Sequence, residues 1–242
     1  IRDRSNNVDT NLSPGNHEEG ITGKCLVMTT PDAERTMHTY LGITANYSNK
    51  EIAIEALRES NYLYIEGYLV AGDHSRAAMI EAKQLAEQND VKTALTFSDP
   101  SMVKYFRDQM AEVVGAGVDL LFCNEEEALC WAGTDRLDTA FKRLKEIGRG
   151  VHVTVGSKGS LVCGPDEKPK EVKGFETEAN DTNGAGDMYA AAALSMIVRG
   201  VTHVQAARFG NYAAAQIVRQ YGARLSSVEA YQTIKNQFTH GL

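Results

Sequence analysis

From about residue 51 to the C-terminus, short apolar segments alternate with longer segments of helical periodicity. Apolar residues that recur every three to four positions indicate an amphipathic helix, and short runs of β-branched and aromatic residues indicate strands. Strands and helices in repeated alternation form right-handed crossovers, which place parallel strands in one sheet with helices on its faces. The alternation therefore predicts an α/β fold with a mainly parallel central sheet.

The predicted elements cover most of the chain. Strands are expected at 24–30, 35–41, 62–65, 91–97, 118–123, 151–155 and 160–163. Helices are expected at 51–60, 75–89, 101–114, 125–131, 138–147 with Asp138 as N-cap, 188–199, 203–221 and 228–238. Residues 1–20 are polar and typical of a loop. The first two strands stand apart from the alternation, so residues 31–34 are expected to join them into a hairpin.

Composition and charge exclude several classes of protein. The net charge of −7 disfavours non-specific binding of nucleic acid or of an acidic membrane surface. No apolar run approaches the roughly 18–20 residues that span a bilayer, and the first residues lack the apolar region of a signal peptide. We therefore expect a cytoplasmic protein with neither a nucleic-acid nor a membrane partner.

The four cysteines show no CxxC pair and no metal-ligand spacing with histidine. Cys25, Cys123 and Cys163 lie within apolar runs. We expect these three to be buried free thiols in a reducing compartment.

The segment 181–194, DTNGAGDMYAAAAL, places a Gly-Ala-Gly turn directly before a helix of small residues. The first amides of a helix have no intrahelical acceptor, and glycine lets an anion such as phosphate approach them closely. Asp187 would repel that phosphate unless it accepts the proton of a hydroxyl group that attacks phosphorus. Alternatively, Gly184 and Gly186 only make a tight turn, and Asp187 only favours the helix N-terminus. The residues alone leave both interpretations open.

The pattern D-T-x-G-A-G-D, with Asn183 at the variable position, resembles the signature of the ribokinase-like (PfkB) family of sugar and nucleoside kinases. The resemblance implies ATP as phosphoryl donor, with Mg²⁺, and Asp187 as the catalytic base. It assigns the anion hole to the amides of Gly184, Ala185 and Gly186. It also implies a place for a monovalent cation such as K⁺ near Asp181 and Thr182.

Residues 124–127, Asn-Glu-Glu-Glu, follow the strand at 118–123 and resemble the N-x-x-E motif of that family. The resemblance implies that Asn124 belongs to the ATP site and that Glu127 positions Mg²⁺ through its waters. The structural alternative is a capping box, in which Asn124 and Glu127 satisfy the first amides of a helix. The two interpretations are compatible, because a capped helix holds a carboxylate rigidly.

Two later segments resemble other parts of the family's ATP site. Residues 154–159 resemble the strand and turn beneath the phosphates and ribose, and residues 211–223 the helix and loop that border adenine. The residues that the resemblance assigns to ATP are Thr154, Gly156, Ser157, Gly159 and Asn211. From the residues alone, the first segment is a structural turn with Lys158 in solvent, and the second is a core helix with Gly222 as its C′ cap.

Residues 22–37 resemble the family's lid hairpin, and the match continues through 41–46. This segment, with Glu66-Gly67-Tyr68, is most similar to bacterial adenosine-kinase-like members. Thr22 and Gly23 would then contact the acceptor substrate, whereas Arg35 and His38 fit solvent-facing positions of the flap equally well. A lid of this kind often pairs, so a homodimer is expected.

The resemblance begins at about Val8, and it departs from the family at the front of the chain. The family normally begins with a strand carrying a substrate-binding Asp and then a G-G-x-x-x-N segment, and neither is found. We therefore expect one N-terminally incomplete ribokinase-like domain over 1–242. It would be a three-layer αβα sandwich with a lid at about 20–45, and missing strands would leave an exposed sheet edge prone to pairing.

Three functions remain open: an adenosine-type nucleoside kinase, a sugar kinase, and a catalytically silent nucleotide-binding fragment. The first two act on a small-molecule alcohol, whereas the third binds ATP without turnover. Other nucleotide and hydrolase motifs are absent, since the sequence contains no GxxxxGK[ST], no GxGxxG after a strand, no HExxH and no GxSxG.

Overall fold

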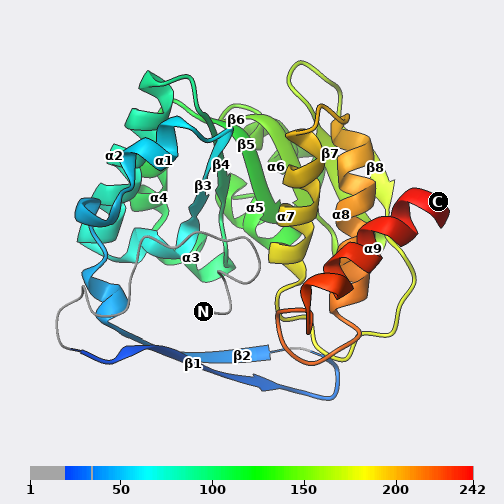
Figure 1. The fold of residues 1–242 in the computed structure, drawn as a ribbon. Coiled ribbons are helices and arrows are strands. Elements are labelled where there is room, and N and C mark those ends of the chain that lie inside the picture. Colours follow the sequence, from blue (N-terminus) through cyan, green and yellow to red (C-terminus); the bar gives the residue numbers. More distant parts are fainter. Residues whose placement is uncertain (1–19, 34, 242) are drawn as a thin grey trace.

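The structure, a computed structural model, describes residues 20–33 and 35–241, apart from the side chains of Arg35 and His240. Its main sheet has six strands in the order β3-β4-β5-β6-β7-β8 (Figure 1). The strands are β3 (Tyr62–Glu66), β4 (Lys92–Thr96), β5 (Val118–Asn124), β6 (Gly148–Thr154), β7 (Gly159–Cys163) and β8 (Lys170–Lys173). Strands β3 to β6 are parallel, and β7 and β8 are antiparallel to their neighbours. The predicted α/β fold with a mainly parallel sheet is confirmed.

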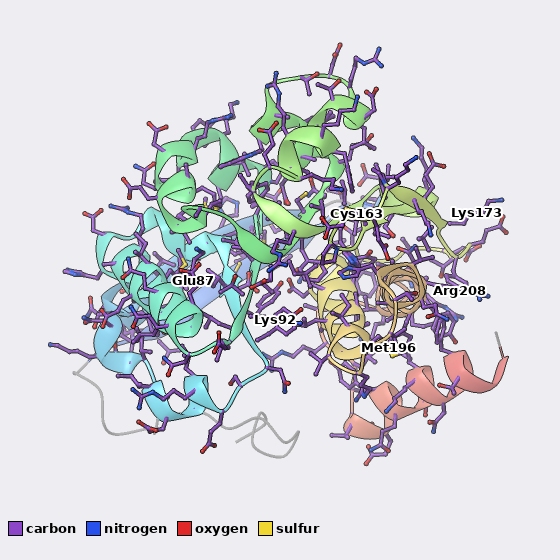
Figure 2. The ribbon with its side chains drawn as sticks, turned by 90° about the horizontal axis from the view of Figure 1, so that it is seen from above. Glu87, Lys92, Cys163, Lys173, Met196 and Arg208 are labelled. Atoms are coloured by element: carbon purple, nitrogen blue, oxygen red, sulfur yellow. The ribbon has the colours of Figure 1, made fainter. Side chains whose placement is uncertain are left out.

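Helices cover both faces of this sheet. One face packs against α2 (Asp73–Gln88), α3 (Pro100–Tyr105), α4 (Arg107–Val114), α5 (Glu125–Ala132) and α6 (Leu137–Leu144). The other packs against α7 (Ala185–Ile197) and α8 (His203–Ile217), with α9 (Val228–Gly241) outside α8. A short α1 (Ile54–Arg58) contacts α2. Viewed from above, Glu87 on α2 and Lys173 on β8 mark opposite sides of this three-layer molecule (Figure 2).

The central strands are buried on both faces, which explains their nearly continuous apolar sequences. On β5, Leu121 packs in the core beneath α2 to α6, whereas Phe122 packs in the core beneath α7 and α8. On β6, Val151 and Val153 face the first of these cores. His152 lies between them and therefore points to the α7–α8 side, where its ring meets that of Phe122.

A separate hairpin of β1 (Thr22–Thr29) and β2 (Arg35–Gly42) stretches beneath the sheet and the start of α7 (Figure 1). Its connecting loop reaches the segment before α7, because the Ala33 carbonyl accepts hydrogen bonds from the Thr182 hydroxyl at 2.9 Å and amide at 3.3 Å. The predicted hairpin is confirmed. Glu34, in its predicted connection, and residues 1–19 lie outside the described residues.

Several predicted boundaries were wrong for local reasons. The helix predicted at 101–114 is two helices, because Phe106 leaves helical geometry between α3 and α4. Asp138 is not an N-cap: Arg136 occupies that position, and Asp138 pairs with its guanidinium at 2.9 Å. The helix predicted at 51–60 begins only at Ile54.

Two further predictions are wrong, those for the end of helix α8 with its cap and for the burial of Cys25, and one strand was missed. Helix α8 ends at Ile217, and Gly222 is not its C′ cap, since the Gly222 amide donates to Asp181 instead. Cys25 is exposed on the hairpin, whereas Cys123 and Cys163 are buried as predicted. Strand β8 was missed, because only Val172 of its four residues is buried and pairing with β7 defines it.

Candidate active site

A cavity of about 570 Å³ lies between the β6–β7 turn, the start of α7 and the second half of α8. Eight residues predicted for the site line it together: Thr154, Gly156, Ser157, Gly159, Thr182, Ala185, Gly186 and Asn211. The other predicted residues are not part of this lining: Thr22, Gly23, Asn124, Glu127, Asp181, Gly184 and Asp187. Apolar groups such as Phe175, Ala214 and Val218 line the cavity as well.

The start of α7 presents backbone amides beside this cavity. Gly184 is the N-cap in left-handed geometry, with φ of 79°, and a Cβ there would lie 2.8 Å from Ala223. A Cβ on Gly186 would meet no atom within 4 Å. The Ala185 amide donates to Thr182 at 3.2 Å, whereas no hydrogen bond is described for the amides of Gly186 and Asp187. Free amides at the positive end of a helix form a site suited to an anion such as phosphate.

Asp187 lies in the first turn of α7 and is exposed. Within the described part of the chain, no hydrogen bond or ion pair occupies its carboxylate. A carboxylate without a partner, next to free helix amides, is placed to accept a proton from a bound alcohol.

The carboxylates of Glu66 and Glu127, like that of Asp187, are close enough to Tyr64 on β3 to affect its pKa. The pKa of Tyr64 is raised, first by burial and then by the charges of Glu66, Asp187 and Glu127. The pKa of Glu66 is raised by burial and further by Asp187, although the hydroxyl of Ser98 donates to Glu66 at 3.0 Å and opposes this rise. Carboxyl groups from β3, α5 and α7 are thus gathered at one end of the sheet.

Sequence analysis assigned no role to Tyr64 or Glu66 in the site. Their position could have been inferred, because the carboxyl ends of neighbouring parallel strands meet at one sheet edge and ligands bind there. Glu66 ends β3, Ser98 follows β4, and Asn124 ends β5. Gly67 has a structural role beside them, since a Cβ there would lie 2.6 Å from the Thr96 carbonyl.

Asn124 and Glu127 form the predicted capping box. The Asn124 side chain accepts from the Glu127 amide at 2.8 Å, and the Asn124 backbone and side-chain N–H groups donate to the Glu127 carboxylate. Glu127 is 3% exposed. A carboxylate can accept about four hydrogen bonds, so Glu127 could also accept one from a metal-bound water.

Asp181 and Thr182 join the segments around the cavity. Asp181 is buried, and its two oxygens accept from the amides of Asn183 and Gly222, each at 2.9 Å. Thr182 holds the loop of the hairpin through Ala33. Asn211 donates to the carbonyls of Val172 and Lys173, so it also fixes strand β8 at the cavity wall.

Thr22 and Gly23 lie at the start of β1. The side chains of Lys158 and His38 are exposed, which agrees with the interpretation that they face solvent. Within residues 20–33 and 35–241, no group of three or more His, Cys, Asp or Glu side chains is placed to hold a metal directly. In the same ranges, no helix is long and apolar enough to cross a membrane.

Known proteins resemble this chain in both sequence and fold. The chain is 26% identical over 225 residues to adenosine kinase from Dictyostelium discoideum, with 86% of this chain and 65% of that protein aligned. It is 24% identical over 223 residues to ribokinase from Haemophilus influenzae, with 89% and 69% aligned.

Among solved structures, adenosine kinase from Sinorhizobium meliloti is 30% identical with a TM-score of 0.83, and 89% of this chain covers 66% of that one. A probable sugar kinase from Rhizobium etli CFN 42 is 26% identical with a TM-score of 0.82, and 88% covers 66%. The chain thus spans about two thirds of the length of these relatives. Residues 3–230 match the family described as "pfkB family carbohydrate kinase", and the chain belongs to that family.

Proposed function

We propose that this chain transfers the γ-phosphoryl group of ATP to an alcohol of an adenosine-like nucleoside or of a sugar. One observation carries the proposal: the free amides of Gly186 and Asp187 at the start of α7 lie beside a cavity, with the Asp187 carboxylate next to them. The amides would bind the phosphates, and Asp187 would accept the proton of the attacking hydroxyl. Family membership supports the same chemistry.

The phosphates of ATP would occupy the end of the cavity formed by Ala185 and Gly186, and the remainder of the nucleotide would lie along residues 154–159 and Asn211. Mg²⁺ would neutralise phosphate charge when bound. Glu127 would orient it through water, since no described cluster of side chains can hold the ion directly. A monovalent cation such as K⁺ would lie near Asp181 and Thr182, which join the loops beside α7.

The proposed acceptor is adenosine, because adenosine kinases are found both among the curated relatives and among the solved structures at 30% identity. A sugar acceptor such as ribose, fructose or ketodeoxygluconate is the alternative, which the ribokinase and sugar-kinase relatives support. Thr22 and Gly23 on the hairpin would contribute to acceptor binding. A chain that binds ATP without any acceptor is the remaining alternative.

The test is ADP release from the 242-residue chain with Mg·ATP and each acceptor in turn. Turnover with adenosine alone supports the nucleoside kinase, and turnover with one sugar alone identifies a sugar kinase. ATP binding without turnover on any acceptor indicates the silent nucleotide-binding protein.

Asp187→Asn tests the assigned base. Loss of a general base lowers kcat by about 10²- to 10⁴-fold, and ATP binding should change little because the helix amides remain. Asp108→Asn is a matched control, since Asp108 is also an exposed acid in a first helical turn, on α4. A variant Asp187→Asn that keeps more than half of the wild-type rate would contradict the role.

We also propose that two copies of the chain pair through the hairpin. Leu26, Met28 and Tyr40 share one face of β1 and β2 by the pairing of Leu26 with His38 and of Lys24 with Tyr40. These three apolar side chains are 63%, 46% and 58% exposed. A two-stranded sheet is only marginally stable without packing, so a second copy would stabilise it.

A further inference from the structure

Tyr189, His152 and His203 form a hydrogen-bonded chain from the cavity wall to the protein surface. Tyr189 lies on α7, two residues after Asp187, and lines the cavity. Its hydroxyl is 2.9 Å from Nδ1 of His152 on β6, and Nε2 of His152 is 3.0 Å from Nδ1 of His203. Tyr189 and His152 are buried, whereas His203, the first residue of α8, is half-buried. A chain of hydrogen bonds therefore links the cavity wall to His203, which is partly exposed to solvent.

His152 is neutral within this chain. Burial lowers its pKa to about 3, and the neighbouring His203 contributes to the change. A neutral imidazole carries a proton on one nitrogen only, so it donates through that nitrogen and accepts through the other. The direction of the hydrogen bonds thus depends on which nitrogen of His152 holds the proton.

Protonation of His203 decides this direction. Neutral His203 can accept at Nδ1 from His152 Nε2, and His152 Nδ1 then accepts from the Tyr189 hydroxyl. Charged His203 has protons on both nitrogens, so its Nδ1 can only donate. His152 must then carry its proton on Nδ1 and donate to the Tyr189 oxygen, and the proton of the Tyr189 hydroxyl needs another acceptor.

Ser160 on β7 can be that acceptor. Among the described residues, its Oγ is the buried side-chain polar atom that has no hydrogen-bond partner. The Ser160 hydroxyl is close enough to that of Tyr189 to lower the pKa of Tyr189, although burial has the larger effect and raises it. A bond from Tyr189 would satisfy this buried oxygen, which is unfavourable when unpaired.

The surroundings of His203 are built to hold its ring. A Cβ at Gly150 or at Gly164 would lie 2.8 Å from the imidazole, so these two glycines leave room for it. Besides His152, two charged groups act on His203: Glu167, after β7, raises its pKa, and Lys92 on β4 (labelled in Figure 2) lowers it. Burial is the largest effect and leaves the pKa of His203 lowered.

We propose that His152 is a positioning residue for the cavity: it holds Tyr189 in the cavity wall and passes the protonation state of His203 to that tyrosine. Only the identity of the ligand, Mg·ATP, rests on the proposed function. When His203 is charged, Tyr189 is tied to β6 through His152 and to β7 through Ser160. The wall is then more ordered before the ligand arrives, so ATP binds more tightly.

The first test needs no nucleotide. NMR of the whole chain with ¹⁵N-labelled histidine follows both nitrogens of each ring as the pH falls from about 8 to about 4.5. At the pH where His203 becomes charged, His152 should stay neutral and move its proton from Nε2 to Nδ1. His74, exposed on α2 at the other face of the sheet, is an internal control, and the signals of His152 should not follow those of His74.

The variant His203→Gln cannot be charged, so His152 should keep one tautomer over the whole pH range. The proposal is overturned if His152 in the wild-type chain shows no change at the midpoint of His203. It is equally overturned if the same change persists in His203→Gln.

The second test measures the Kd of Mg·ATP above and below the His203 midpoint. Wild-type affinity should be about fivefold higher below it, the effect of one added hydrogen bond. Tyr189→Phe keeps the ring and removes the hydroxyl, so this pH dependence should disappear. The protonation of ATP itself is common to both proteins and cancels in the comparison.

A purely structural role for Tyr189 would lower the Tm of Tyr189→Phe and leave the pH dependence of ATP affinity intact, and this result overturns the proposal. Absence of ATP binding at every pH has a different meaning. It would refute the proposed function and the nucleotide part of this inference, and the NMR measurement would still decide whether His152 relays the charge of His203.

Discussion

At the scale of single residues, the two glycines at the start of α7 are needed for different reasons. Gly184 is required by backbone geometry, because its φ is 79° and the position of its missing Cβ is occupied by Ala223. At Gly186, neither the backbone conformation nor the available space requires a glycine. Its φ is not in the left-handed region, and no atom lies within 4 Å of the position that a Cβ would take. The protein fold therefore explains Gly184, whereas the close approach of a phosphate, as proposed above, would explain Gly186.

The pair of variants Gly184→Ala and Gly186→Ala separates these causes. Gly184→Ala should lower the free energy of unfolding by about 1–3 kcal/mol, because it forces a left-handed alanine against Ala223. Gly186→Ala should leave stability equal or slightly higher, since alanine favours a helix, and should raise the KM for ATP. Urea unfolding and steady-state kinetics measure the two effects. Equal losses of stability in both variants would contradict the distinction.

His152 makes stability depend on pH. The unfolded chain binds a proton on this histidine below its ordinary pKa of 6.5, whereas in the folded chain burial lowers the pKa to about 3. Between these values the unfolded state holds more protons, so stability is present above pH 6.5 and is lost as the pH falls. The contribution is about 1.4 kcal/mol per pH unit.

His152→Gln cannot titrate and can still form hydrogen bonds. The free energy of unfolding is measured in urea at several pH values from about 6.5 to about 4.5. Its slope against pH should be smaller in the variant than in the wild type, because unfolding of the variant takes up about one proton fewer. Parallel curves for the two proteins would show that His152 is charged in the folded state.

At the scale of elements, the hairpin is held to the body of the protein at its connecting loop. The hydroxyl of Thr182, before α7, donates to the Ala33 carbonyl, and Ala33 is 4% exposed. The segment that carries the proposed anion site therefore also anchors the proposed lid. Release of this contact should affect the lid without moving helix α7.

Thr182→Val removes the hydroxyl and keeps the shape of the side chain. A hydrogen bond of about 0.5–1.5 kcal/mol is lost, so limited proteolysis within the hairpin should be about two- to tenfold faster, and the KM for the acceptor should rise. Thr233→Val is the control, because the Thr233 hydroxyl also donates to a backbone carbonyl, that of Glu229 on α9. Equal proteolysis of wild type and Thr182→Val would show that this contact does not hold the hairpin.

At the scale of the whole molecule, the hairpin and the main body differ in how they are stabilised. Strands β3 to β7 are packed between helices on both faces, whereas, among the residues that the structure describes, β1 and β2 pair only with each other. Exposed Leu26, Met28 and Tyr40 on one face of this hairpin form an apolar surface that a second copy would cover.

Leu26→Glu tests the proposed pairing. The wild-type chain should sediment as a dimer, and a charge in the apolar face should shift it toward the monomer, because an unpaired buried charge is strongly unfavourable. Tyr105→Glu is the control, since Tyr105 on α3 is 69% exposed and lies outside the hairpin. A wild-type chain that sediments as a monomer at micromolar concentration would refute the proposal.

Local patterns predicted the parallel sheet and the hairpin, whereas the resemblance to the PfkB family predicted eight of the residues that line the cavity. The β-strands around Leu121 and Val151 could be recognised because both faces of a parallel sheet are apolar. The capping box of Asn124 and Glu127 is likewise confirmed, since it joins residues only three apart. Strand β8 could not be found, because Lys170–Lys173 is polar and becomes a strand only through pairing with β7.

The sequence by itself determined most of the segments that form helices and strands, and it placed a Gly-Ala-Gly turn before α7, because these features depend on neighbours along the chain. Only the tertiary structure decided that Glu66 lies near Asp187 and that Gly222 donates to Asp181. It also decided that His152 joins Tyr189 to His203. These contacts join residues 37 to 121 positions apart. Their energy comes from tertiary packing, which no local pattern of residues encodes.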